Sequence, residues 1–128
     1  MDDITFKYSF INELSLDEIS DLAYLTFGIF GCMRRNLYTA YNNGDSLPVA
    51  IAYKNEKAIG WAFLSPYYLN VENELTCMCF VDENYRRKGI GSRLVQNVKN
   101  RTDKNLSYGL CDNKLKFFIK NGITKLQW

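Results

Sequence analysis

Several residue types and patterns that signal particular classes of function are missing from this sequence. It contains no histidine, and its four cysteines include no CxxC pair, so the common zinc-ligand sets are absent and we expect no metal site. The longest apolar runs are far too short to span a bilayer, and the acidic start Met-Asp-Asp is no secretory signal. We therefore expect a cytoplasmic protein that has no membrane partner and keeps its cysteines reduced.

The charge balance gives little support for a nucleic-acid partner. Sixteen Lys and Arg residues are set against fourteen Asp and Glu residues, which leaves a formal net charge of only +2. The basic residues Arg34, Arg35 and 86–88 are not interleaved with aromatic residues on one element, as in many proteins that bind single-stranded nucleic acid. A nucleic-acid-directed function is therefore the least favoured hypothesis.

The chain length and its even composition predict one domain spanning residues 1–128. A chain of 128 residues is long enough to bury about two-thirds of its unfolded surface. We find no internal repeat, linker or low-complexity tract that would mark a boundary.

The most informative stretch is residues 81–95, V-D-E-N-Y-R-R-K-G-I-G-S-R-L-V. The residues before it, 75–81, are apolar on both alternating faces, which predicts a strand buried on both sides, with Cys77 and Cys79 as small core residues. After it, apolar residues recur at helical spacing and polar residues fill the opposite face, which predicts an amphipathic helix. The apolar helix positions are Ile90, Leu94, Val95 and Val98.

The turn between that strand and that helix combines three cations, 86–88, with the glycines Gly89 and Gly91. Glycine has no side chain and tolerates positive φ, so a ligand can approach the backbone closely there. The N–H groups and dipole at a helix start favour anions, and adjacent cations strengthen the site. We expect this turn to hold phosphate, although a basic, solvated turn that merely starts a helix is the simpler alternative.

The turn resembles the pyrophosphate loop of the GCN5-related N-acetyltransferase (GNAT) family. Its Arg86-x-x-Gly89-x-Gly91 matches that family's Arg/Gln-x-x-Gly-x-Gly/Ala pattern. A P-loop needs a Gly-x-x-x-x-Gly-Lys-Ser/Thr run that is absent, and a Rossmann fingerprint needs a further glycine in a parallel βαβ unit. Two further segments, 58–62 and 117–123, are similar to the third strand and the last helix of the family.

The order of expected elements also resembles the GNAT fold. We expect six strands, at 4–10, 47–53, 58–64, 75–81, 105–110 and 123–128. We also expect four helices: one that starts near Leu16, one over 33–41, one after Gly89, and one capped by Asp112. Ser15 and Glu18 form a capping box before the first helix. The fold class is α/β (α+β): a mixed, mostly antiparallel six-stranded sheet flanked by about four helices.

The resemblance implies acetyl-CoA as cosubstrate, without a metal. Backbone groups of Cys79, Phe80 and Val81 would pair with the pantetheine arm, and an N–H there could stabilise the tetrahedral oxyanion. The amides of 87–92 would surround the pyrophosphate. The cofactor-binding residues that the resemblance implies are Cys79, Phe80, Val81, Arg86, Arg87, Lys88, Gly89, Ile90, Gly91, Ser92, Cys111 and Phe118.

Catalysis would need a base for the amine acceptor and an acid for the departing thiolate. Without histidine the base is expected to be a carboxylate, with Glu74 the best placed and Glu72 and Asp82 as weaker options. Members of the family often supply the acid from a tyrosine in the last helix, but that position is Phe118 here. Tyr108, Cys111 or water would then be the donor.

Two functions remain open after these expectations. The first is an N-acetyltransferase that acts on a primary amine by direct attack; the second is a catalytically inactive GNAT-fold module that binds acyl-CoA or another protein. Relatives usually continue past Trp128 with a seventh strand, so this chain would either leave a sheet edge exposed or borrow a strand from a second copy, which makes a homodimer possible. The loop 27–32 and the rim at Tyr67 and Tyr68 would choose the acceptor.

Overall fold

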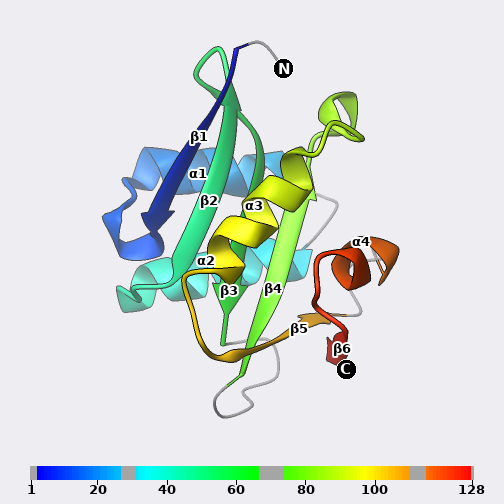
Figure 1. Ribbon diagram of the computed structural model, residues 1–128. Coiled ribbons are helices and arrows are strands. Elements are labelled where there is room, and N and C mark those ends of the chain that lie inside the picture. Colours follow the sequence, from blue (N-terminus) through cyan, green and yellow to red (C-terminus); the bar gives the residue numbers. More distant parts are fainter. Residues whose placement is uncertain (1–2, 27–30, 67–73, 110–114, 128) are drawn as a thin grey trace.

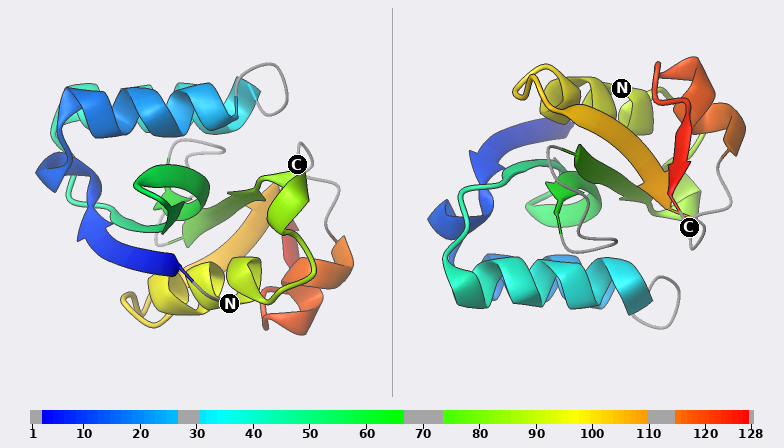
Figure 2. Two further views of the ribbon diagram at one scale, coloured as in Figure 1. Left: turned by 90° about the horizontal axis from the view of Figure 1, so that it is seen from above. Right: turned by 90° about the horizontal axis from the view of Figure 1, so that it is seen from below.

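The computed structural model describes residues 3–26, 31–66, 74–109 and 115–127. A six-stranded sheet in the order β1-β2-β3-β4-β5-β6 lies between α1 and α2 on one face and α3 and α4 on the other (Figures 1 and 2). The strands are β1 (Ile4–Phe10), β2 (Pro48–Lys54), β3 (Lys57–Ser65), β4 (Glu74–Val81), β5 (Asn105–Gly109) and β6 (Lys125–Gln127). The helices are α1 (Leu16–Leu25), α2 (Gly31–Asn43), α3 (Ile90–Lys99) and α4 (Leu115–Lys120), with short 3-10 turns η1 (Ile11–Glu13) and η2 (Glu83–Tyr85).

The sheet changes from antiparallel to parallel at β4, which confirms the predicted mixed, mostly antiparallel architecture. β1 to β4 pair antiparallel in sequence order, whereas β4–β5 and β5–β6 are parallel. The pairing of β4 with β5 stops at Cys77 and Tyr108, while its pairing with β3 continues to Val81. The second half of β4 therefore has β3 on one side and has parted from β5 on the other.

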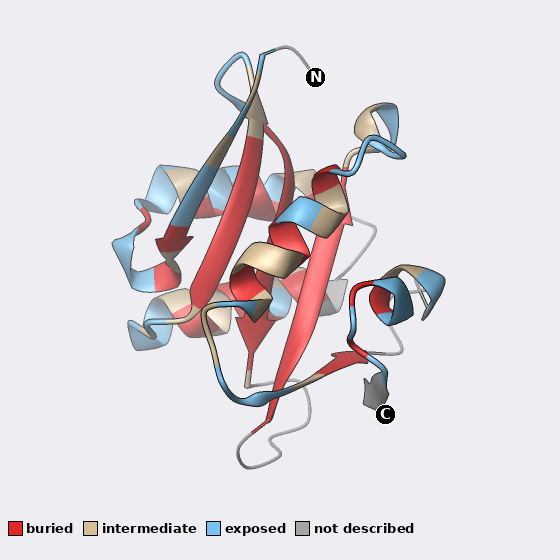
Figure 3. Ribbon diagram, in the orientation of Figure 1, coloured by how far each residue is buried: buried red, intermediate tan, exposed pale blue. Residues whose placement is uncertain are grey.

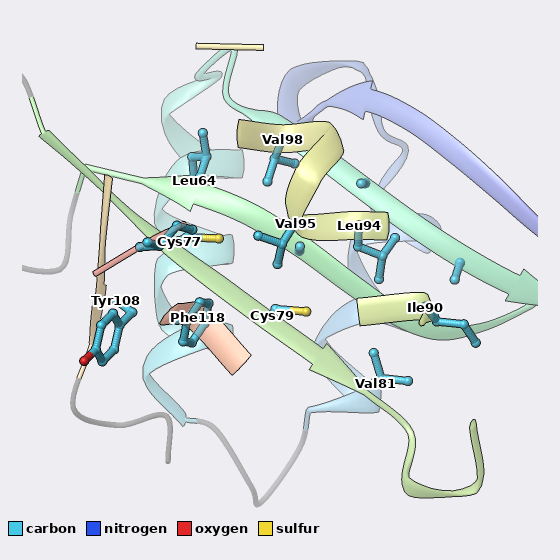
Figure 4. Packing of buried hydrophobic residues seen from close by; sticks show 14 of the residues in the cluster. Leu64, Cys77, Cys79, Val81, Ile90, Leu94, Val95, Val98, Tyr108 and Phe118 are labelled. Atoms are coloured by element: carbon cyan, nitrogen blue, oxygen red, sulfur yellow. The ribbon is translucent and has the colours of Figure 1, made fainter. Parts of the chain in front are cut away.

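β4 is buried along its whole length, as its apolar alternation predicts (Figure 3). Cys77, Cys79 and Val81 pack with α3 in one hydrophobic cluster (Figure 4). Met78 and Phe80, on the opposite face, pack in a second cluster with residues of α1 and α2. The central strand thus connects both layers of the core, and its C-terminal end leads directly into the glycine-bearing turn.

The start of α1 is fixed by the predicted capping box. Ser15 Oγ accepts a hydrogen bond from the Glu18 N–H at 3.1 Å, and the Ser15 N–H donates to Glu18 Oε1 at 2.9 Å. Lys7 of β1 also binds the Glu18 carboxylate, at 2.5 Å. This contact and the two capping hydrogen bonds lower the pKa of Glu18.

Several boundaries differ from the expectations. α2 begins at Gly31, two residues before the predicted start, and β6 covers only 125–127. Of the apolar loop predicted at 27–32, residues 27–30 lie outside the described part, and the last two residues belong to α2. Asp112, Cys111, Glu72, Tyr67 and Tyr68 also lie outside it. No helix in the described ranges is long and apolar enough to cross a bilayer.

Candidate functional site

The connection from β4 to α3 has the backbone of an anion-binding turn. Arg87 and Gly89 have positive φ, 65° and 81°, and Ile90 then begins α3. A left-handed residue beside right-handed ones turns successive N–H groups toward one side, and such concave arrangements bind phosphate. The strain of a positive φ at a non-glycine residue such as Arg87 is typical of functional turns.

The two glycines of the motif have different structural roles. A Cβ at Gly89 would meet nothing within 4 Å, so this residue is needed for its φ and leaves the surface of the turn open. A Cβ at Gly91 would approach the Phe117 ring to 3.1 Å. The absence of a side chain at Gly91 therefore lets α4 pack against the first turn of α3, in addition to any role toward a ligand.

A cavity of about 360 Å³ lies between this turn, the end of β4 and α4. β4 and α3 contribute apolar residues, and the turn contributes two arginines and the two glycines. It is lined by Cys79, Val81, Tyr85, Arg86, Arg87, Gly89, Ile90, Gly91, Ser92, Phe117 and Lys120. Such a cavity, apolar with an anion-binding rim, fits a ligand that has a diphosphate and a long neutral arm.

Polar contacts hold α4 over the cavity. Asn121, directly after α4, donates from Nδ2 to Ser92 Oγ at 3.2 Å. Gln96 Nε2 donates in turn to the Asn121 carbonyl at 3.1 Å. These bonds tie the end of α4 to α3, and they position Phe117 and Lys120 as one wall of the cavity.

The three cations of the turn do not act alike. Arg86 Nε donates to the Val81 carbonyl at 2.7 Å, and its guanidinium lies 5.3 Å from the centre of the Phe80 ring, so Arg86 braces the turn against β4. Lys88 Nζ lies 5.9 Å from the centre of the Tyr85 ring. Arg87 is exposed and lines the cavity. Arg87 is therefore the cation best placed to meet an anion there.

Eight of the twelve predicted binding residues line the cavity, and Lys88 is one that does not. The Phe80 side chain packs on the α1/α2 face, which leaves only its backbone near the cavity. Phe118 is fully buried, does not line the cavity, and lies parallel to the Tyr108 ring at 5.3 Å (Figure 4). Its neighbour Phe117 lines the cavity instead. Cys111 lies outside the described residues.

Sequence reasoning missed three residues of the cavity wall: Tyr85, Phe117 and Lys120. Phe117 and Lys120 are three positions apart and therefore share one face of α4. The sequence could therefore have indicated that these two residues lie together. Only the packing of α4 against Gly91 shows that their face of the helix contacts the turn.

The candidate catalytic residues lie at different points along the sheet, and Glu74, Tyr108 and Asp82 are not among the residues that line the cavity. Tyr108 is paired with Cys77, the last residue of β4 that pairs with β5. Glu74 begins β4, is only 6% exposed, and lies roughly 23 Å from Val81 along the strand at about 3.3 Å per residue. Asp82 Oδ1 accepts the Asn84 N–H at 3.0 Å and so caps η2. Glu74 therefore lies at the opposite end of β4 from the anion-binding turn and about 10 Å along the strand from Cys77, whereas Tyr108 lies where β4 and β5 part.

Comparisons with known proteins identify the family. A model of the acetyltransferase (GNAT) domain matches residues 45–122, more than half of the chain. The chain belongs to the GNAT acetyltransferase family. Membership supports acyl transfer in general, and the matched segment includes β4, the turn and α3.

Several solved structures share the fold at low sequence identity. Escherichia coli ElaA is 17% identical, with 93% of this chain and 85% of that chain covered and a TM-score of 0.68. A possible acetyltransferase from Clostridium difficile 630 is 13% identical, with 98% and 93% covered and a TM-score of 0.65. The aminoglycoside N-acetyltransferase AAC(6')-Iy in complex with CoA is 16% identical, with 98% and 90% covered and a TM-score of 0.62. A comparison with curated proteins gives no match by sequence.

Proposed function

We propose that this GNAT protein is an acetyl-CoA-dependent N-acetyltransferase that transfers acetyl to a primary amine by direct attack in a ternary complex. The observation that carries the proposal is the cavity in which the exposed turn at Gly89 meets the end of β4. A diphosphate and an extended arm that bears amides need these two features side by side. The CoA bound to AAC(6')-Iy, a structure with the same fold, is consistent with this choice of donor.

The residues of the cavity fit the two parts of such a donor. The N–H groups of 87–92 and the Arg87 guanidinium would hold the diphosphate. The Asp82 N–H donates to the Ile59 carbonyl of β3 at 2.7 Å, so it points toward β3. Successive N–H groups of a strand point to alternate sides. The N–H groups of Cys79 and Val81 therefore point away from β3, to the side from which β5 has parted. An extended arm would lie along that side as an added strand does.

Two residues are proposed to move protons. Acetyl-CoA, when bound, supplies an activated thioester. Glu74 would accept a proton from the amine, directly or through water, and the Tyr108 hydroxyl would donate a proton to the departing thiolate. Tyr108 stacks on Phe118, the position at which relatives often have a tyrosine, so the two rings occupy neighbouring places. A strand residue would thus replace the helix residue as acid.

A second candidate is acyl-CoA binding without turnover. It is favoured by Phe118, which has no proton to give and is fully buried. Binding would be the same under both proposals, so only the appearance of free thiol separates them. Turnover with any amine would rule out the second candidate.

Thermal unfolding in the presence of acetyl-CoA tests the donor first. A ligand at a hundredfold excess over its dissociation constant should stabilise the protein by about 2.7 kcal/mol. Thiol release should then be followed against a panel of primary amines. The proposal would be contradicted if acetyl-CoA left the melting temperature unchanged and gave no heat of binding in calorimetry.

A further inference from the structure

A second cavity adjoins the proposed donor site. It has a volume of about 280 Å³ and lies between the β2–β3 turn and η2, at the same end of the sheet as the anion-binding turn (Figure 1). Its lining residues are Lys54, Asn55, Lys57, Ile59, Asp82, Asn84 and Tyr85. Tyr85 also lines the first cavity, so one side chain forms a wall of both.

The chemistry of this second cavity favours an anion. Lys54 and Lys57, on either side of the β2–β3 turn, contribute two cations, and Asp82 contributes the single carboxylate among the lining residues. The Asp82 carboxylate already accepts the backbone N–H of Asn84 at 3.0 Å. The cavity therefore has a net positive charge, and the side-chain amides of Asn55 and Asn84 add hydrogen-bond donors.

We propose that this second cavity binds the 3′-phosphate of the CoA donor, an inference that rests on the proposed function. CoA carries its diphosphate and its 3′-phosphate on the same ribose, so the sites for these two groups must be close neighbours. Two cavities that share the Tyr85 wall meet this requirement. Lys54 and Lys57 are then specificity residues that distinguish CoA from 3′-dephospho-CoA.

The first cavity offers a competing direction for the ribose. Lys120 of α4 lines that cavity, away from the β2–β3 turn, and would meet the 3′-phosphate if the ribose lay toward α4. The second cavity provides two cations and one carboxylate, whereas the α4 side provides one cation, so the net charge is the same in both places. The Asp82 carboxylate already accepts the Asn84 N–H, however, and a phosphate between the β2–β3 turn and η2 can contact two ammonium groups instead of one.

Calorimetry with CoA and 3′-dephospho-CoA tests the proposal without any need for turnover. The variants are Lys54→Gln with Lys57→Gln, Lys57→Gln alone, Lys120→Gln, and Lys104→Gln, which removes one charge in a remote cavity and is the control for the two single variants. The wild type should bind CoA about tenfold more tightly than 3′-dephospho-CoA, because hydrogen bonds to a charged group are the stronger kind. The double variant should lose this preference while its dissociation constant for 3′-dephospho-CoA changes by less than about twofold.

The remaining outcomes decide between the two proposals. The placement of the 3′-phosphate would be overturned if the double variant still bound CoA more tightly than 3′-dephospho-CoA, or if Lys120→Gln lost that preference. Either result would leave the proposed function standing. Absence of binding of either nucleotide to the wild type would overturn both. Melting temperatures verify that each variant is folded, and Lys57→Gln alone, at an exposed position, should lose part of the preference if the double variant is unstable.

Discussion

At the scale of single residues, Gly89 is the position where backbone conformation and ligand binding depend most directly on each other. Its φ of 81° is one that a β-branched residue adopts only with strain, yet its missing Cβ faces open space. We expect Gly89→Val to abolish acetyl-CoA binding, as measured by calorimetry, because the N–H groups of the turn would no longer converge.

Gly44 supplies a matched control for that substitution. It has a φ of 67°, and a Cβ there would also meet nothing within 4 Å, but it follows α2. Gly44→Val should cost a similar amount of stability and leave acetyl-CoA binding within about twofold of the wild type, because it does not touch the turn. Equal loss of binding in both variants would show that destabilisation, and not the shape of the turn, is responsible.

Tyr108 tests the proposed proton donor. Tyr108→Phe should lower kcat by about a hundredfold, in the range for general acids, and leave the affinity for acetyl-CoA unchanged. The measurement is steady-state thiol release with the best amine of the panel, together with calorimetry. Phe118→Tyr in the Tyr108→Phe background moves a hydroxyl to the neighbouring stacked ring and should restore part of the rate. An unchanged kcat in Tyr108→Phe would assign the proton to another donor.

At the scale of elements, the start of α1 couples folding to pH. Hydrogen bonds from Lys7 and from the Ser15 backbone lower the pKa of Glu18 below 4.5 in the folded state. The unfolded chain then binds more protons between the two pKa values, so this contribution to stability is present above pH 4.5 and is lost on acidification.

In Glu18→Gln, the free energy of unfolding should therefore fall less steeply as the pH is lowered below 4.5 than it does in the wild type. The measurement is urea unfolding at a series of pH values below 4.5, where the wild type loses this contribution and the variant has none to lose. Glu83→Gln, which removes an exposed carboxylate in η2, is the control and should keep the wild-type slope. Identical slopes in the wild type and Glu18→Gln would contradict the assigned coupling.

At the scale of the whole molecule, two hydrophobic clusters share the strands β2, β3 and β4. Leu37 of α2 and Leu94 of α3 are fully buried in different clusters, on opposite faces of the sheet. We expect Leu37→Ala and Leu94→Ala each to lower the free energy of unfolding by about 2–5 kcal/mol in one transition common to both layers. Far-UV and near-UV circular dichroism during denaturation would measure this, and two separated transitions would contradict the expected single domain.

Much of the fold was predictable because its signals are local. The capping box at Ser15 and Glu18, the apolar alternation of β4 and the helical spacing after Gly89 each depend on neighbouring residues. The boundaries of α2 and β6 were predicted less well, because the last turns of a helix and the length of a short edge strand depend on packing.

The sequence by itself determined the order of the elements, the buried central strand and the glycine-bearing turn, because each is encoded within one stretch of chain. Only the tertiary structure decided the walls of the cavity: where β4 parts from β5, how α4 brings Phe117 against Gly91, and how Tyr85 separates two cavities. Arg101, which donates to the carbonyls of Ser9 and Val49, was invisible in the sequence for the same reason. Such contacts join residues far apart in the chain, and strand register and helix packing, which no local pattern specifies, bring them together.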